Sequence, residues 1–228
     1  MGYTLDFSFV SEYLPVSLEG AKLTLIISAI AVLFGTVMGS VLYFLKSVNI
    51  KIFGIKPFNI IASTYIEIVR GTPMILQIMM VYSGSALFLG IDIEALYAAI
   101  IAVSLNSAAY VSEIIRAGIE AVDKGQMEAA RSLGMNRGQA MRMIIIPQAV
   151  KNILPAIGNE FVVVIKESSM ASVIGVHELM FSANIVKGAT YKPFEPLMVV
   201  AAFYFVMTFT LGRLMKYIER RMKASDIR

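Results

Sequence analysis

The sequence predicts an all-α, polytopic membrane protein with about five transmembrane helices. Of its 228 residues, 57% are hydrophobic and only 16% are charged, which lies outside the range of an ordinary soluble domain. The mean hydropathy is +0.73. The apolar residues also gather into stretches of about 20 or more, the length that crosses the hydrocarbon core of a bilayer.

The apolar stretches place the five spans at about residues 18–45, 57–88, 93–121, 143–166 and 195–217. The run Gly71-Thr72-Pro73 predicts a kink or break in the second span. Pro147, Pro155 and Gly158 predict interruptions in the fourth span. The residues 167–194 are expected to form a longer loop.

Charges in the connectors predict the orientation of the chain. The segment before residue 17 carries Asp6 and Glu12 and no Lys or Arg, whereas the first connector carries Lys46, Lys51 and Lys56. The third connector and the carboxyl end are also basic, with Lys124, Arg131, Arg137, Arg142, Arg220 and Arg221. Because Lys and Arg favour the cytoplasmic side, we expect the amino terminus outside and the carboxyl terminus in the cytoplasm.

The polar segment at about 123–142, between the third and fourth spans, is predicted to form two short helices. Asp123 can cap the first helix, with Gln126 completing a capping box, and Asn136 begins the second helix with the same pattern. Gly134 is a natural end for the first helix.

One face of the first short helix carries Met127, Ala130 and Leu133 at helical spacing. The small residues Ala129 and Ala130 would let another surface approach closely. The residues alone leave two alternatives open, which are a docking surface for a soluble partner and a capped connector between two membrane helices.

Ionisable side chains inside the predicted spans are costly in lipid and need partners. Glu67 and Arg70 lie three residues apart on the second span, and Glu113 and Arg116 do the same on the third. This spacing puts each acid and base on one helix face. We expect two ion pairs, Glu67–Arg70 and Glu113–Arg116. In each pair the two charges neutralise each other and fix helix packing.

Glu160 has no basic residue three or four positions away, which makes it the candidate for contacting the cationic group of a substrate. The neutral polar candidates for the rest of a substrate site are Asn159, Ser104, Asn106, Ser107 and Tyr110. The alternative role for these neutral groups is hydrogen bonding between helices. Gly35 and Gly39 form a Gly-x-x-x-Gly pattern on the first span, which permits close helix packing.

Other classes of site find little support in the sequence. There is no Cys and only one His, His177, which leaves almost no transition-metal chemistry. No Gly-x-x-x-x-Gly-Lys run followed by Ser or Thr is present, so we expect no nucleotide site in this chain. The net charge of +4 follows from membrane topology and does not indicate nucleic-acid binding. No constellation of His, Cys or Ser suggests an enzyme, and we expect no bound cofactor or metal.

One spaced motif indicates a family. Glu128, Ala129, Ala130, Gly134, Ile144 and Pro147 follow the cytoplasmic loop signature of importer permeases of the ATP-binding cassette (ABC) class, which this chain resembles. Ile146 stands where that family usually has Leu. From about residue 17 to 222 the chain resembles the polar amino acid branch, the histidine, glutamine and arginine permeases. The supporting stretches are 65–73, 110–116, 158–161 and 166–169, with Ser168 differing from the Thr of the relatives.

The resemblance implies a single permease domain over residues 1–228 with an importer-type ABC fold. It also implies that Glu128, Ala129, Ala130, Leu133 and Gly134 couple the permease to a separate ATPase subunit, which binds ATP and Mg. Further implied partners are a second permease chain, identical or homologous, and an extracytoplasmic amino-acid-binding protein. The expected location is a prokaryotic plasma membrane, and the expected substrate is a polar amino acid, with basic amino acids as the kind that fits an acid-lined path. The alternative is a secondary transporter or channel for small polar solutes, driven by an ion gradient.

Overall fold

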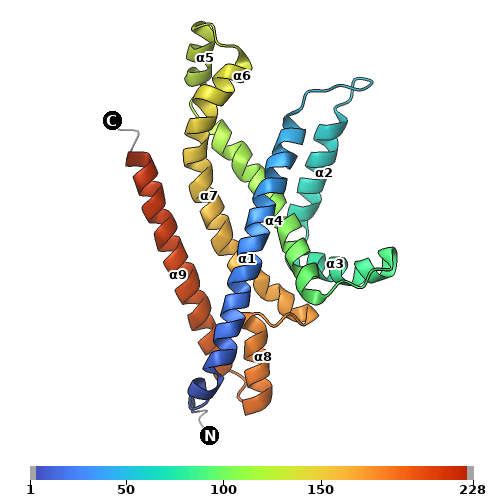
Figure 1. Cartoon of the computed structure of the whole chain (residues 1–228), viewed down its shortest axis with the longest axis vertical. Helices are drawn as coiled ribbons and strands as arrows, with labels where there is room; N and C mark the ends of the chain where they lie inside the picture. The colour runs from blue at the N-terminus through green and yellow to red at the C-terminus, as the bar shows by residue number, and fades with distance from the viewer. Residues whose placement is uncertain (1–3, 225–228) are drawn as a thin grey trace.

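The computed structural model describes the backbone of residues 4–224 and the side chains of residues 4–222, and this part of the chain is almost entirely helical (Figure 1). In chain order the elements are α1 (Val10–Ser47), α2 (Pro57–Gly71), α3 (Met74–Leu89), α4 (Ala95–Glu120), α5 (Lys124–Ser132), α6 (Arg137–Ala140), the π-helical segment η1 (Met141–Ile145), α7 (Ile146–Glu167), the 3₁₀ segment η2 (Ser168–Ile174), α8 (Leu179–Thr190) and α9 (Glu195–Ala224).

The described part of the chain contains three helices that are long and apolar enough to cross a membrane, α1, α4 and α9. Two bent helix pairs bring the number of candidate spans to five if each pair counts as one span. This agrees with the five predicted spans. The first begins earlier than predicted, at Val10.

Small residues let α1 and α4 pack closely at the centre of the molecule. A Cβ atom added to Gly35 would lie 2.7 Å from Ser107 Cβ, and one added to Gly39 would lie 2.7 Å from the carbonyl oxygen of Ala108. Neither position therefore has room for a side chain. The Gly-x-x-x-Gly pattern does bring two helices together here.

The predicted break in the second span is present, since the chain bends by 110° between α2 and α3. The side-chain amide of Gln77 holds the corner. Its Nε2 donates to the carbonyl oxygen of Val69 at 2.7 Å and to Thr72 Oγ1 at 2.8 Å. Because Pro73 has no N–H to donate, the break leaves carbonyl groups without helical partners, and Gln77 satisfies one of them.

The fourth span differs from the prediction, because α7 continues without a break through Pro155 and Gly158. Pro147 lies in the first turn of α7, directly after the π-helical segment η1. The bend comes later, because the chain bends by 49° between the stretch Arg137–Ile174 and α8. Gly175 lies at this bend and has a φ of +86°, a conformation that glycine adopts without strain.

The segment 167–194, predicted as a loop, instead contains η2 and the partly buried helix α8. Glu178 caps α8, and its carboxylate accepts hydrogen bonds from the N–H groups of Met180 and Phe181, each at 2.9 Å. It also accepts one from the Tyr204 hydroxyl at 3.0 Å. The acid before an apolar run of helical length was the sequence signal for this helix.

The two ends of the molecule carry different elements (Figure 1). The α1–α2 connector, α5, α6 and the carboxyl-terminal end of α9 lie at one end. The amino-terminal segment and α8 lie at the other. The basic first and third connectors thus share one end, as the alternating charge predicts.

Candidate functional site

The short helix α5 stands at one end of the molecule and is capped at its start by Asp123. The Asp123 Oδ1 atom accepts a hydrogen bond from the N–H of Gly125 at 2.7 Å. The predicted reciprocal bond from Gln126 is not formed. Gln126 Oε1 instead accepts from Gln148 Nε2 of α7 at 3.3 Å, which ties α5 to the following helix.

At the other end of α5, Gly134 stops the helix as predicted. Its φ is +87°, and its N–H donates to the carbonyl oxygen of Arg131 at 3.0 Å. The N–H of Met135 donates to the carbonyl oxygen of Ala130 at 3.1 Å. These two bonds form a Schellman motif. The predicted capping box of the next helix, α6, is also present at Asn136.

The surface of α5 differs from the predicted docking face at Ala130 and, in part, at Met127. Glu128 and Ala129 are exposed, and Leu133 is 85% exposed. Ala130, in contrast, is only 4% exposed, because this side of α5 packs on α6 and η1. Ala130 therefore serves internal packing, and Met127 joins it in part by packing against the cluster around Ile145.

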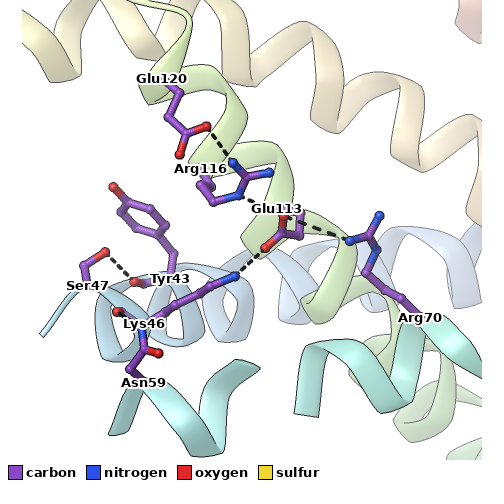
Figure 2. Close-up of polar contacts among 8 residues, drawn as sticks. All are labelled: Tyr43, Lys46, Ser47, Asn59, Arg70, Glu113, Arg116 and Glu120. Atoms are coloured by element: carbon purple, nitrogen blue, oxygen red, sulfur yellow. Dashed lines mark hydrogen bonds and ion pairs between the residues drawn. The ribbon is translucent and has the colours of Figure 1, made fainter. Parts of the chain in front are cut away.

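Glu113 of α4 is the centre of a network of charges that connects three helices (Figure 2). Its carboxylate contacts Lys46 of α1 at 2.9 Å and Arg116 of α4 at 2.9 Å. Arg116 also pairs with Glu120 one turn further along α4. The predicted Glu113–Arg116 pair is present, as one part of this larger network.

The predicted Glu67–Arg70 pair does not form among the described residues. Arg70 of α2 points toward α4, where its guanidinium lies 4.0 Å from the Glu113 carboxylate and 5.4 Å from the centre of the Tyr110 ring. Glu67 is exposed on the outer side of α2. Arg70 therefore pairs across the contact between α2 and α4 and not with its neighbour on the same helix.

Several of the predicted substrate-binding residues have partners within the chain. Asn106 donates from Nδ2 to Gln77 Oε1 at 2.9 Å, so it supports the corner between α2 and α3. The Ser104 hydroxyl donates to the carbonyl oxygen of Ile100 at 2.6 Å. Tyr110 lies under Arg70. These three residues join helices or satisfy the backbone, which is the alternative role that the sequence left open.

Glu160 and Ser107 are brought together. Glu160 of α7 is 8% exposed, and the Ser107 hydroxyl of α4 lies close to its carboxylate. Ser107 Oγ is buried and has no hydrogen-bond partner of good geometry among the described residues. Asn159 lies on a different face of α7 from Glu160 and is exposed. An acid and an unsatisfied hydroxyl thus face each other between α4 and α7.

The described residues contain no group of three or more His, Asp and Glu side chains that could hold a metal ion. The chemistry that this arrangement offers is ionic binding and hydrogen bonding, at Glu160 and at the exposed surface of α5.

Sequence reasoning missed three residues that organise these sites, namely Lys46, Gln77 and Glu178. Lys46 had a signal, because it is the first charge after the long apolar run of α1. Gln77 also had one, because an amide in an apolar stretch beside a Pro break can satisfy freed carbonyl groups.

The chain is similar to known proteins over almost its whole length. Residues 52–224 match the family model described as a binding-protein-dependent transport system inner membrane component. The chain is 45% identical over 222 residues to the arginine transport system permease protein ArtQ of Bacillus subtilis, covering 97% of this chain and 99% of that protein. It is 34% identical over 219 residues to the glutamine transport system permease protein GlnP of Escherichia coli K12, covering 96% and 98%.

Two solved structures are also similar in fold to the chain. The crystal structure of an amino acid ABC transporter with histidines matches with a TM-score of 0.91 at 48% sequence identity, over 96% of this chain and 100% of that one. The methionine ABC transporter MetNI, in an inward-facing conformation, matches with a TM-score of 0.76 at 18% identity, over 96% and 99%. The second match is a similarity of fold.

Proposed function

The chain belongs to the family of inner membrane components of binding-protein-dependent transport systems, and on this premise we propose that it carries polar amino acids, basic ones above all. It is a multi-pass permease subunit of the cytoplasmic membrane and works with an ATPase subunit and a solute-binding protein. This membership confirms the predicted family and argues against the ion-gradient alternative. The relatives named for arginine and glutamine support the class of substrate.

The observation that best supports the coupling role is the geometry of α5. A helix of this length is marginal alone, yet both of its ends are capped and its inner face packs on η1 and α6. Its outer face presents Glu128, Ala129 and Leu133. A rigid helix with an exposed surface can transmit a movement of the ATPase subunit to the membrane helices. Ala130 contributes by packing the inner face of α5, and Gly134 contributes by ending the helix.

The proposal includes an orientation in the membrane and an assembly of several subunits. The end of the molecule with α5 and the basic connectors faces the cytoplasm, where Lys and Arg are favoured, and the amino terminus lies outside. Two permease chains, identical or homologous, enclose the path between them, because a single chain leaves much of α3 without protein cover. Two ATPase subunits then dock on the paired α5 helices.

Within each chain, Glu160 is the contact for the cationic group of the substrate, and Ser107 supplies a second polar contact. A carboxylate that shares its buried surroundings with an unsatisfied hydroxyl can gain a partner when an ammonium or guanidinium group arrives. Ser104, Asn106 and Tyr110 hold the helices that carry this pair.

Uptake of radiolabelled arginine into proteoliposomes tests the substrate contact, with the permease, its ATPase and its binding protein reconstituted together. We expect Glu160→Gln to reduce arginine uptake at least tenfold, since removing a charge-assisted bond costs about 1.5–3 kcal/mol. Glu19→Gln is the matched control, because Glu19 is an exposed acid near the start of α1. Unchanged arginine uptake by an assembled Glu160→Gln complex would remove Glu160 from the site and leave the permease role intact.

A further inference from the structure

The connector between α1 and α2 contains a small hairpin, residues 50–56, whose tip has an unusual backbone. Ile52 and Ile55 form an antiparallel bridge with N–H to carbonyl bonds of 2.8 and 3.0 Å. Between them, Phe53 and Gly54 have φ values of +51° and +82°. Positive φ at both central positions is what a type I′ turn requires, and Asn, Asp or Gly usually supplies the first of them. Turn geometry therefore does not explain the phenylalanine, and strain of this kind points to a function.

The hairpin exposes its apolar side chains. Phe53 is fully exposed, at 101%, and three isoleucines beside it, Ile50, Ile52 and Ile55, are each about half exposed. The side chains of Lys51 and Lys56 are exposed among them. A cluster of exposed apolar residues of this kind marks an interaction surface, and the two lysines indicate an anionic partner.

The base of the hairpin is fixed at the level where the apolar run of α1 ends. No charged residue occurs between Lys22 and Lys46, so Lys46 marks the boundary of the hydrocarbon core. Lys46 is held by Glu113, and its carbonyl oxygen accepts a hydrogen bond from Asn59 Nδ2 at 2.7 Å (Figure 2). The hairpin thus starts from a rigid base in the interfacial layer of the membrane.

We propose that this hairpin is a membrane anchor, in which Phe53 and the neighbouring isoleucines enter the interface between headgroups and acyl chains. Lys51 and Lys56 bind the headgroups of anionic phospholipids. The membrane is the occupant because the apolar surface continues from α1 into the hairpin and the flanking charges are positive. Figure 1 shows the hairpin well apart from α5, the surface that a soluble subunit engages. The anchor holds the corner at which α1 and α2 leave the bilayer, next to the Glu113 network.

The chain has no tryptophan, so a single Phe53→Trp variant places one fluorescent reporter at the tip. The full-length variant is reconstituted into vesicles of phosphatidylcholine and phosphatidylglycerol that contain brominated acyl chains. Two single-tryptophan references accompany it. Phe205→Trp lies on the exposed apolar face of α9, and Leu133→Trp lies on the exposed tip of α5.

We expect brominated lipid to quench Phe53→Trp nearly as strongly as Phe205→Trp and several-fold more than Leu133→Trp. In a Lys51→Gln, Lys56→Gln background, we expect the quenching to lose its dependence on the phosphatidylglycerol content. Quenching equal to that of Leu133→Trp would overturn the proposal. So would protection of Phe53→Trp from quenching when the ATPase subunit is added, since a protein would then be the occupant. The tip contacts nothing else in the described chain, so the variant keeps the fold.

Discussion

Replacing Glu113 with Gln removes the acid on which three helices converge. Lys46 and Arg116 each lie 2.9 Å from its carboxylate, and Arg70 lies at 4.0 Å. The Glu113 side chain is only 16% exposed. The variant therefore leaves three cations near one another without the charge that offsets their repulsion.

The expected cost lies between two limits. Breaking a fully buried ion pair by removing one partner costs about 3–5 kcal/mol, whereas an exposed pair contributes about 0–1 kcal/mol. The partners of Glu113 are 28–45% exposed on their side chains, so we expect Glu113→Gln to lower the free energy of unfolding by about 2 kcal/mol. The control is Glu19→Gln, whose pair with Lys22 is 3.8 Å long and exposed, with an expected cost below about 0.5 kcal/mol.

Unfolding of the purified chain by dodecyl sulfate in mixed micelles, followed by the loss of helical circular dichroism, measures both variants. A double-mutant cycle with Lys46→Met isolates the central pair. We expect a coupling energy of about 1 kcal/mol between Lys46 and Glu113. Equal stability losses for Glu113→Gln and Glu19→Gln, or a coupling energy of zero, would refute the idea that the network holds the helices together.

Three further predictions use the same unfolding assay. Gly39→Ala places a methyl group against the backbone of α4 and should cost about 1–3 kcal/mol, whereas no atom lies within 4 Å of a Cβ added at Gly212 of α9, so Gly212→Ala should be near neutral; equal losses would contradict this. Gln77→Leu removes the donor that holds the corner between α2 and α3 and should cost about 1–3 kcal/mol; an unchanged stability would show that the corner needs no donor. A hydrogen bond from Lys192 and one from a backbone N–H lower the pKa of Asp6 from 3.8 to about 2. The folded state thus holds the ionised form more strongly than the unfolded state, and the stability that Asp6 adds over Asp6→Asn is present above about pH 4 and disappears as the pH falls through about 2; a stability difference independent of pH would contradict it.

The features that the sequence predicted correctly are those set by neighbouring residues. The number of apolar stretches, the break at Gly71-Thr72-Pro73 and the left-handed end at Gly134 each depend on a few adjacent positions. The close approach at Gly35 and Gly39 needed only the absence of two side chains. The family motif around Glu128 added the function, because its spacing is specific.

The features that the sequence predicted wrongly depend on packing between distant segments. Arg70 has an acid three residues away, yet it lies beside Glu113 because α2 packs on α4. Helical periodicity put Ala130 on the docking face, but α5 turns that side toward η1 and α6. Pro155 suggested a broken helix, and the bend occurs at Gly175 instead. Sequence spacing alone does not show which distant segments the fold brings together.

The coupling role of α5 is tested most directly by measuring ATP-dependent arginine uptake and ATP hydrolysis together in reconstituted proteoliposomes. Leu133→Asp puts a charge on the exposed tip of α5, and Leu133→Met keeps its apolar surface as the matched control. We expect Leu133→Asp to abolish most uptake and its coupling to ATP hydrolysis, and Leu133→Met to retain both. Full uptake by Leu133→Asp, or uptake by the unaltered chain that needs a proton gradient and no ATP, would contradict the account.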